Sequence, residues 1–152
     1  MRSRVLLFLA PLAFCGCNLF TDATGGGDAE ALAGAWASTS FLAVTPDGMT
    51  SVDIMDSLSG HFDAEFRKTG GLDVVDLSVF MPGQPVSYTV SASYHLSGDT
   101  MTVDYVDGPI DYELVRGENS LAIALRDADF DFDGDQQTEP AQLLAVLEKV
   151  VN

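Results

Sequence analysis

Cysteine is almost absent from this sequence, and its two cysteines lie close together near the start. Cys15 and Cys17 are separated by one glycine, and no cysteine follows Cys17. The rest of the chain can therefore form no internal disulfide, no thiolate metal site and no cysteine nucleophile. A fold after Cys17 has to be stabilised by hydrophobic burial, which a chain of this length can supply without covalent links.

Basic residues are also scarce. The 152 residues include 7 lysines and arginines against 23 aspartates and glutamates, which gives a formal net charge of −16. A body with this charge repels nucleic-acid phosphates and anionic lipid surfaces. Nucleic acid is therefore excluded as a partner.

A hydrophobic run long enough to span a membrane is missing. Residues 5–14 form an apolar stretch of ten residues, interrupted by Pro11 and preceded by Arg2 and Arg4. Ten helical residues rise only about 15 Å, half of a bilayer core of about 30 Å. A short positive segment followed by a short apolar segment is typical of a signal peptide.

The end of this apolar stretch, Phe14-Cys15-Gly16-Cys17, resembles a lipobox, the bacterial motif in which a small residue precedes the cysteine that is acylated. The resemblance implies cleavage before Cys17 and lipidation of Cys17 by palmitate and related acyl chains. Cys15 is the rival site, but the bulky Phe14 would precede it, so Cys17 is favoured. An ordinary secretory signal with incidental cysteines is the remaining alternative.

A bacterial lipoprotein of the cell envelope is the expected product, held to a membrane by its acyl chains. Lipoproteins of an inner membrane typically carry Asp after the lipidated cysteine, so Asn18 favours the outer membrane. Three segments follow from this interpretation: a signal peptide at 1–16, the acylated cysteine with a flexible linker around Gly25-Gly26-Gly27 at 17–30, and one folded domain at 31–152.

Hydrophobic and polar residues alternate through most of the predicted domain, most strictly over residues 86–97. A period of two indicates a strand with one buried face. Glycine, proline, asparagine and aspartate separate successive strands, as in consecutive antiparallel hairpins. Eight strands are expected, near 33–45, 61–67, 75–81, 86–97, 100–105, 110–114, 121–126 and 141–150.

Eight short strands in meander order could form a sandwich or a closed barrel. The long connections of a Greek key are missing, so the pattern favours an all-β, eight-stranded, antiparallel up-and-down barrel. Residues 51–58 look irregular or weakly helical. Residues 141–150 also fit helical spacing, but a strand is favoured there because the first strand of a barrel needs a partner.

Gly34-Ala35-Trp36, at the start of the first expected strand, resembles the Gly-x-Trp signature of the lipocalins. The resemblance implies a lipocalin-like barrel that Trp36 closes at one end, with a cation from the last strand packed over its ring. Lys149 is the only basic residue in that last segment. The domain also looks like the lipocalin-like domains of bacterial lipoproteins, in which an acidic loop like residues 131–135 precedes Glu-Pro and a final strand.

That acidic loop is a candidate calcium site. Asp129, Asp131, Asp133 and the following Gly134 match the first half of a calcium loop, and Asp135 continues the alternation. The second half fails, because Pro140 occupies the twelfth position. The alternative is that Phe130 and Phe132 point inward and the aspartates face water. This alternative requires a β-bulge near 126–129, since odd-numbered residues point inward before it.

The function expected from these patterns is binding. No nucleophile is paired with a base, His61 and His95 fall on polar faces, and no cofactor other than calcium is indicated, so an enzyme is not expected. A lipidated barrel would hold a small apolar ligand against inward-facing residues. The alternative is a structural or interaction lipoprotein of the envelope, with a packed barrel and a cation-attracting acidic loop; no protein partner is indicated. The candidate lining residues are Phe62, Phe66, Tyr88, Tyr94 and Met101.

Overall fold

The computed structural model describes residues 29–84 and 87–151, so Cys17 and the segments predicted as signal peptide and linker up to residue 28 lie outside the described residues. No helix among the described residues is both long and apolar enough to cross a membrane. The elements in chain order are α1 (Ala29–Leu32), β1 (Gly34–Val44), β2 (Ser51–Asp53), α2 (Ile54–Leu58), β3 (His61–Thr69), β4 (Leu72–Phe80), β5 (Tyr88–Ser97), β6 (Thr100–Tyr105), β7 (Gly108–Arg116), β8 (Ser120–Phe130) and β9 (Glu139–Lys149).

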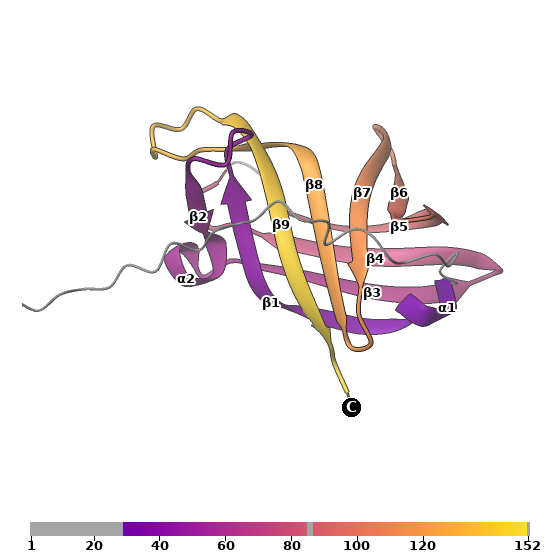
Figure 1. The fold of residues 1–152 in the computed structure, drawn as a ribbon. Coiled ribbons are helices and arrows are strands. Elements are labelled where there is room, and N and C mark those ends of the chain that lie inside the picture. Colours follow the sequence, from indigo (N-terminus) through magenta and orange to yellow (C-terminus); the bar gives the residue numbers. More distant parts are fainter. Residues whose placement is uncertain (1–28, 85–86, 152) are drawn as a thin grey trace, which may run out of the picture.

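Eight of the nine strands form a closed antiparallel barrel (Figure 1). Strands β1 and β3–β9 each pair with their neighbours in the chain, and β9 returns to pair with β1 from Trp36↔Lys149 to Val44↔Gln142. Strand β2 is an added three-residue strand that pairs with β1. The prediction of an eight-stranded antiparallel up-and-down barrel is therefore confirmed, and residues 139–149 are a strand and not a helix.

The barrel interior is filled by the residues that alternate along each strand. On β4, for example, Val75, Leu77 and Val79 are buried while the residues between them are more exposed. The core continues with Phe41 on β1, which meets Phe62 of β3 edge to face at 5.7 Å between ring centroids. Alternation in the sequence thus becomes one continuous apolar core.

Trp36 lies at one end of this core and is almost fully buried. Its indole Nε1 donates a hydrogen bond of 2.8 Å to the carbonyl oxygen of Leu32 in α1. The ammonium nitrogen of Lys149 lies over the ring, as the lipocalin resemblance implied. Gly34 has a φ of +117°, and a Cβ atom there would come within 3.2 Å of Lys149 Cε, so glycine suits this position for both reasons.

The segment predicted as irregular or weakly helical contains β2 and the single turn of α2. Asp53 caps the helix by accepting a hydrogen bond from the backbone N–H of Asp56, and the side chain of Ile54, the first residue of the helix, is fully buried. Gly60 follows, and a Cβ atom there would come within 2.5 Å of both the Ile54 side chain and the Phe80 carbonyl. The close approach of these backbones requires glycine at this position.

The barrel wall is interrupted where β7 meets β8. Only four residue pairs join the two strands, from Glu113↔Ala124 to Arg116↔Leu121. Strand β8 carries the predicted bulge, with a register shift against β9 between Leu125 and Ala128. Beyond the last pair the two strands diverge, and the tip of the β6–β7 hairpin projects away from β8 (Figure 1). An extra residue in one strand increases its bend and twist, so the bulge helps to separate β8 from β7.

Candidate functional site

A cavity of about 520 Å³ that opens to solvent lies at the interruption between β7 and β8. Its apolar lining includes Val90 on β5, Ile110 on β7, Leu125 and Ala128 on β8, and Leu143 on β9. The size lies within the range of small-molecule sites in proteins. Unpaired strand ends and a bulge thus leave an apolar hollow beside the packed core.

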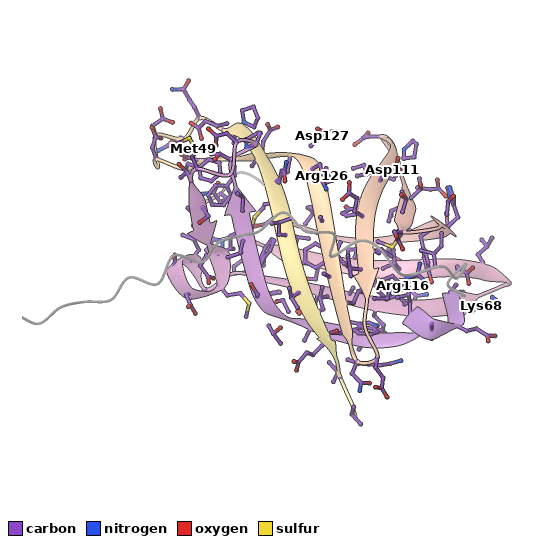
Figure 2. All side chains as sticks on the ribbon, viewed as in Figure 1. Met49, Lys68, Asp111, Arg116, Arg126 and Asp127 are labelled. Carbon is purple, nitrogen blue, oxygen red and sulfur yellow. The ribbon has the colours of Figure 1, made fainter. Side chains whose placement is uncertain are left out.

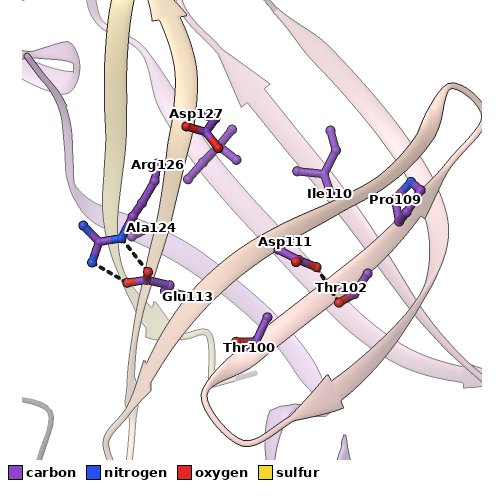
Figure 3. Close-up of a pocket in the computed structure, with 10 residues that line it drawn as sticks. Thr100, Thr102, Pro109, Ile110, Asp111, Glu113, Ala124, Arg126 and Asp127 are labelled. Atoms are coloured by element: carbon purple, nitrogen blue, oxygen red, sulfur yellow. Dashed lines mark hydrogen bonds and ion pairs between the residues drawn. The ribbon is translucent and has the colours of Figure 1, made fainter. Parts of the chain in front are cut away.

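A second hollow, of about 590 Å³, lies along the same interruption (Figure 3). Ile110, Leu125 and Asp127 line both hollows. Strand alternation divides the remaining β7 residues, because Tyr112 lines the first hollow whereas Asp111 and Glu113 line the second. The first hollow therefore lies on the inner side of the barrel wall and the second on the outer side, at one opening.

Three tyrosines form the aromatic wall of the inner cavity. The hydroxyl of Tyr112 lies 2.5 Å from that of Tyr105 and 3.3 Å from that of Tyr88. The rings of Tyr88 and Tyr105 meet edge to face with centroids 6.4 Å apart. We refer to Tyr88, Tyr105 and Tyr112 as the tyrosine cluster. It joins β5, β6 and β7 at a place where β5 and β6 are no longer paired, since their ladder ends at Tyr94↔Val103.

The tyrosine cluster is neutral and has one O–H group that is not used in a hydrogen bond within the cluster. Burial raises the pKa of the Tyr105 and Tyr112 phenols well above the ordinary value, so both are neutral at neutral pH and keep their protons into alkaline pH. Three hydroxyl groups carry three O–H donors, and two hydrogen bonds within the cluster use two of them. One O–H donor therefore remains for a polar atom of a ligand or for water.

The rim of the inner cavity is acidic. Asp107 from the β6–β7 turn and Asp127 and Asp129 from β8 line it, and no lysine or arginine is among its lining residues. Arg126 is the nearest basic residue in sequence, but it binds Glu113 in two contacts of 2.5 and 2.6 Å on the outer side (Figure 3). Figure 2 shows Arg126 and Asp127 beside β8, with Asp111 across the interruption on β7.

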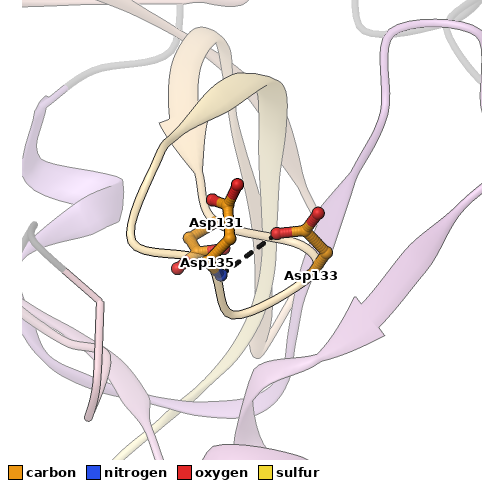
Figure 4. A group of neighbouring side chains, drawn as sticks. All are labelled: Asp131, Asp133 and Asp135. Carbon is orange, nitrogen blue, oxygen red and sulfur yellow. Dashed lines mark hydrogen bonds between the residues drawn. The ribbon is translucent and has the colours of Figure 1, made fainter.

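The acidic loop between β8 and β9 curls instead of staying extended (Figure 4). Oxygen atoms of Asp131, Asp133 and Asp135 all lie within 4.8 Å of one another. Asp129 is not in this group and lies at the cavity rim. Phe130 is buried and Phe132 half-buried, as the water-facing alternative required. Asp131 departs from that alternative because it is buried and accepts backbone hydrogen bonds from Gly134 and Gln136 at 2.7 and 2.9 Å.

Those backbone donors explain why Asp131 faces inward: they replace the water that a buried carboxylate would lose. Two further hydrogen bonds join the loop to the Gln84 side chain. The backbone N–H of Asp131 donates to Gln84 Oε1 at 2.9 Å, and Gln84 Nε2 donates to the Asp131 carbonyl oxygen at 3.1 Å. Hydrogen bonds from the backbone and from Gln84 thus hold the loop in this shape. Calcium binding at Asp131, Asp133 and Asp135 stays a prediction from the sequence.

The structure separates the five residues predicted to contact a ligand. Tyr88 lines the inner cavity, whereas the other four lie buried in the core and are not among its lining residues: Phe62, Phe66, Tyr94 and Met101. Phe66 and Tyr94 pack edge to face at 5.4 Å. Tyr105 and Tyr112 were missed as site residues although their positions in the alternation marked them as inward-facing.

No protein-family model and no curated protein sequence matches the chain. Among solved structures, insecticyanin from the tobacco hornworm Manduca sexta matches with 16% identity and a TM-score of 0.46, over 82% of this chain. This chain spans only 65% of the insecticyanin chain. A deswapped triple mutant of bovine odorant binding protein matches with 18% identity and a TM-score of 0.40, over 80% of this chain and 76% of its own. Because both scores are low, the barrel assignment rests on the strand pairing described above.

Proposed function

We propose that this protein is a membrane-anchored binding protein whose barrel holds a small apolar molecule in the inner cavity. One observation carries the proposal, namely the hollow of about 520 Å³ walled by Val90, Leu125, Leu143 and the tyrosine cluster. Burying an apolar surface in such a site is favourable by about 25 cal/mol for each Å² removed from water. Binding is proposed here, and not catalysis.

Binding of N-phenylnaphthylamine, a neutral apolar dye that fluoresces when it leaves water, tests the cavity. We expect saturable binding by the full-length protein and its loss in Val90→Trp, because the indole would fill the space that the dye occupies. Val146→Trp is the matched control, since Val146 is an exposed valine of β9. No saturable binding by the wild type, or equal binding by both variants, would contradict a ligand-binding cavity.

The anchor is the second part of the proposal. The lipobox-like Phe14-Cys15-Gly16-Cys17 supports acylation of Cys17 and attachment to the cell envelope, with Asn18 favouring the outer membrane. Acyl chains contribute about 0.8 kcal/mol for each buried CH₂, and stable anchoring takes more than one chain. Metabolic labelling with palmitate in a bacterial host should label the wild type and Cys15→Ala but not Cys17→Ala. Labelled, membrane-bound Cys17→Ala would overturn the assignment.

An envelope interaction protein with a fully packed barrel is the competing function. Four of the five predicted contact residues do lie in the packed core, which fits that alternative. The inner cavity favours ligand binding because a barrel that acts only through its outer surface has no need of a hollow behind β7 and β8. The dye experiment separates the two functions directly.

A further inference from the structure

The geometry points to a ligand with an apolar body and a cationic head, such as an amine or a quaternary ammonium group. The body would lie in the inner cavity and the head at its acidic rim. This inference rests on the binding function proposed above and adds the charge of the ligand to it. Acidic residues alone indicate only a solvated surface. These three acidic residues are part of a site because they line the opening of an apolar cavity.

The three rim carboxylates are not neutralised by the protein. Asp107, Asp127 and Asp129 come from two different elements, and their carboxylates make no hydrogen bond or ion pair with the part of the chain that the structure describes. The acids on the outer side differ, because Asp111 accepts a hydrogen bond of 2.6 Å from Thr102 and Glu113 binds Arg126. Negative charge without a protein partner is thus concentrated at the opening of the cavity.

The tyrosine cluster favours a cation for a second reason. Aromatic rings present a negative face, and a cation within about 6 Å of a ring centroid is attracted to it. The three phenols are neutral near neutral pH, as tyrosines ordinarily are, so they add no charge of their own. The phenol oxygens of Tyr88 and Tyr105 both lie within hydrogen-bond distance of the Tyr112 oxygen, and each of the three oxygens carries lone pairs that can accept from a cationic head.

An anionic ligand is disfavoured by the same features. A fatty acid bound in this cavity would bring its carboxylate close to Asp107, Asp127 and Asp129, and no lysine or arginine lines the cavity to bind it. The chain as a whole, at a formal −16, also repels anions and attracts cations toward the opening. Charge complementarity therefore selects among apolar molecules of similar size.

Isothermal titration of the full-length protein with three probes that share a phenylalkyl body and differ in the charge of the head tests the inference. The probes are phenylbutyl-trimethylammonium, phenylpentanol and phenylpentanoate, which carry a positive, a neutral and a negative head. Three exposed carboxylates at the rim lead us to expect about tenfold tighter binding of the ammonium probe than of the carboxylate probe. The triple variant Asp107→Asn, Asp127→Asn, Asp129→Asn should bring the two affinities to within about twofold of each other.

A charge-matched control variant distinguishes local from overall charge. Asp56→Asn, Glu118→Gln and Glu148→Gln remove three exposed charges outside the cavity, and this variant should keep the wild-type preference. Equal affinities in the wild type, a preference for the carboxylate probe, or a preference that survives in the rim variant would overturn the inference while leaving the proposed function intact. Failure of all three probes to bind would overturn the proposed function and the inference together.

Discussion

The ammonium nitrogen of Lys149 lies 5.4 Å from the centroid of the Trp36 ring, at the end of the barrel where β9 pairs with β1. The two residues are direct partners in the strand register, and the aliphatic part of the lysine passes over Gly34. One contact thus links the first and last strands at the point where the barrel closes. Its contribution to stability can be measured, because Trp36 is the only tryptophan and reports unfolding by its fluorescence.

We expect Lys149→Met to lower the free energy of unfolding by about 0.5–1 kcal/mol, since it removes the cation and keeps most of the aliphatic chain. Urea denaturation followed by Trp36 fluorescence measures the loss. Lys68→Met is the control, because Lys68 is an exposed lysine that makes only a 3.7 Å ion pair with Asp73. Equal effects of the two substitutions would show that the ring contact adds nothing.

The tyrosine cluster gives a second prediction about stability. Tyr112→Phe removes both hydrogen bonds of the cluster and should cost about 1–2 kcal/mol of unfolding free energy. Tyr94→Phe is the matched control, since Tyr94 is also buried but its hydroxyl bonds to none of the described residues. Urea denaturation compares the two variants. If Tyr94→Phe proves as destabilising as Tyr112→Phe, the hydroxyl cluster is not a stabilising feature.

Alkaline pH should destabilise the barrel because buried tyrosines resist ionisation in the folded state. Burial raises the pKa of Tyr94 to about 12, and it raises the pKa of Tyr105 and Tyr112 further above the ordinary value. Because the folded pKa is the higher one, these groups contribute full stability below the unfolded pKa of about 10. That contribution is lost as pH rises above it, since the unfolded chain then releases protons that the folded chain keeps.

Absorbance of tyrosinate and circular dichroism, followed together during an alkaline titration, measure this linkage. We expect Tyr94, Tyr105 and Tyr112 to ionise only as the protein unfolds, and all four tyrosines to ionise near their ordinary pKa in urea. Ionisation of all four at their ordinary pKa in protein that is still folded would contradict the burial of the cluster.

The acidic loop provides a test that compares neighbouring aspartates. Asp131→Ala removes the acceptor of two backbone N–H groups and should cost about 1–3 kcal/mol. Asp133→Ala removes a single 3.1 Å acceptor on an exposed residue and should cost less than about 0.5 kcal/mol. Thermal unfolding measures both. Similar losses for the two variants would mean that the buried position of Asp131 carries no extra stability.

Asp133→Ala also tests the calcium prediction. A bound cation stabilises the folded state in proportion to the logarithm of its concentration over its Kd. If the loop binds calcium, millimolar calcium raises the melting temperature of the wild type but not that of Asp133→Ala. An unchanged wild-type melting temperature and no heat of binding would remove calcium from the account of this loop.

Much of the barrel could be predicted from the sequence because alternation is a local property. Val75, Leu77 and Val79 alternate with the polar residues Asp76 and Ser78, so the face that they form is predicted to be buried without knowledge of which strands pair with β4. The bulge in β8 could be predicted because Leu125 and Phe130 must both face inward, and one extra residue is needed to change the parity.

The site could be predicted much less well, because it depends on where pairing stops. The sequence shows that Tyr105 and Tyr112 face inward, but not that β7 leaves β8 after Glu113↔Ala124. Phe62 and Phe66 are predicted to face inward in the same way, yet β3, which is paired with β4 along its whole length, packs them against other side chains of the core. Whether an inward residue fills the core or lines a cavity is decided by the bend and twist of the sheet, which no local pattern encodes.

Mapping the ammonium probe by NMR on methyl-labelled full-length protein tests the central claim most directly. The account predicts saturable shift changes at the methyl groups of Val90, Leu125 and Leu143, which line the inner cavity, and little change at Leu77, which lies in the core on β4 and is not a lining residue. Shift changes confined to the outer surface or to α2, with those three residues unaffected, would contradict it.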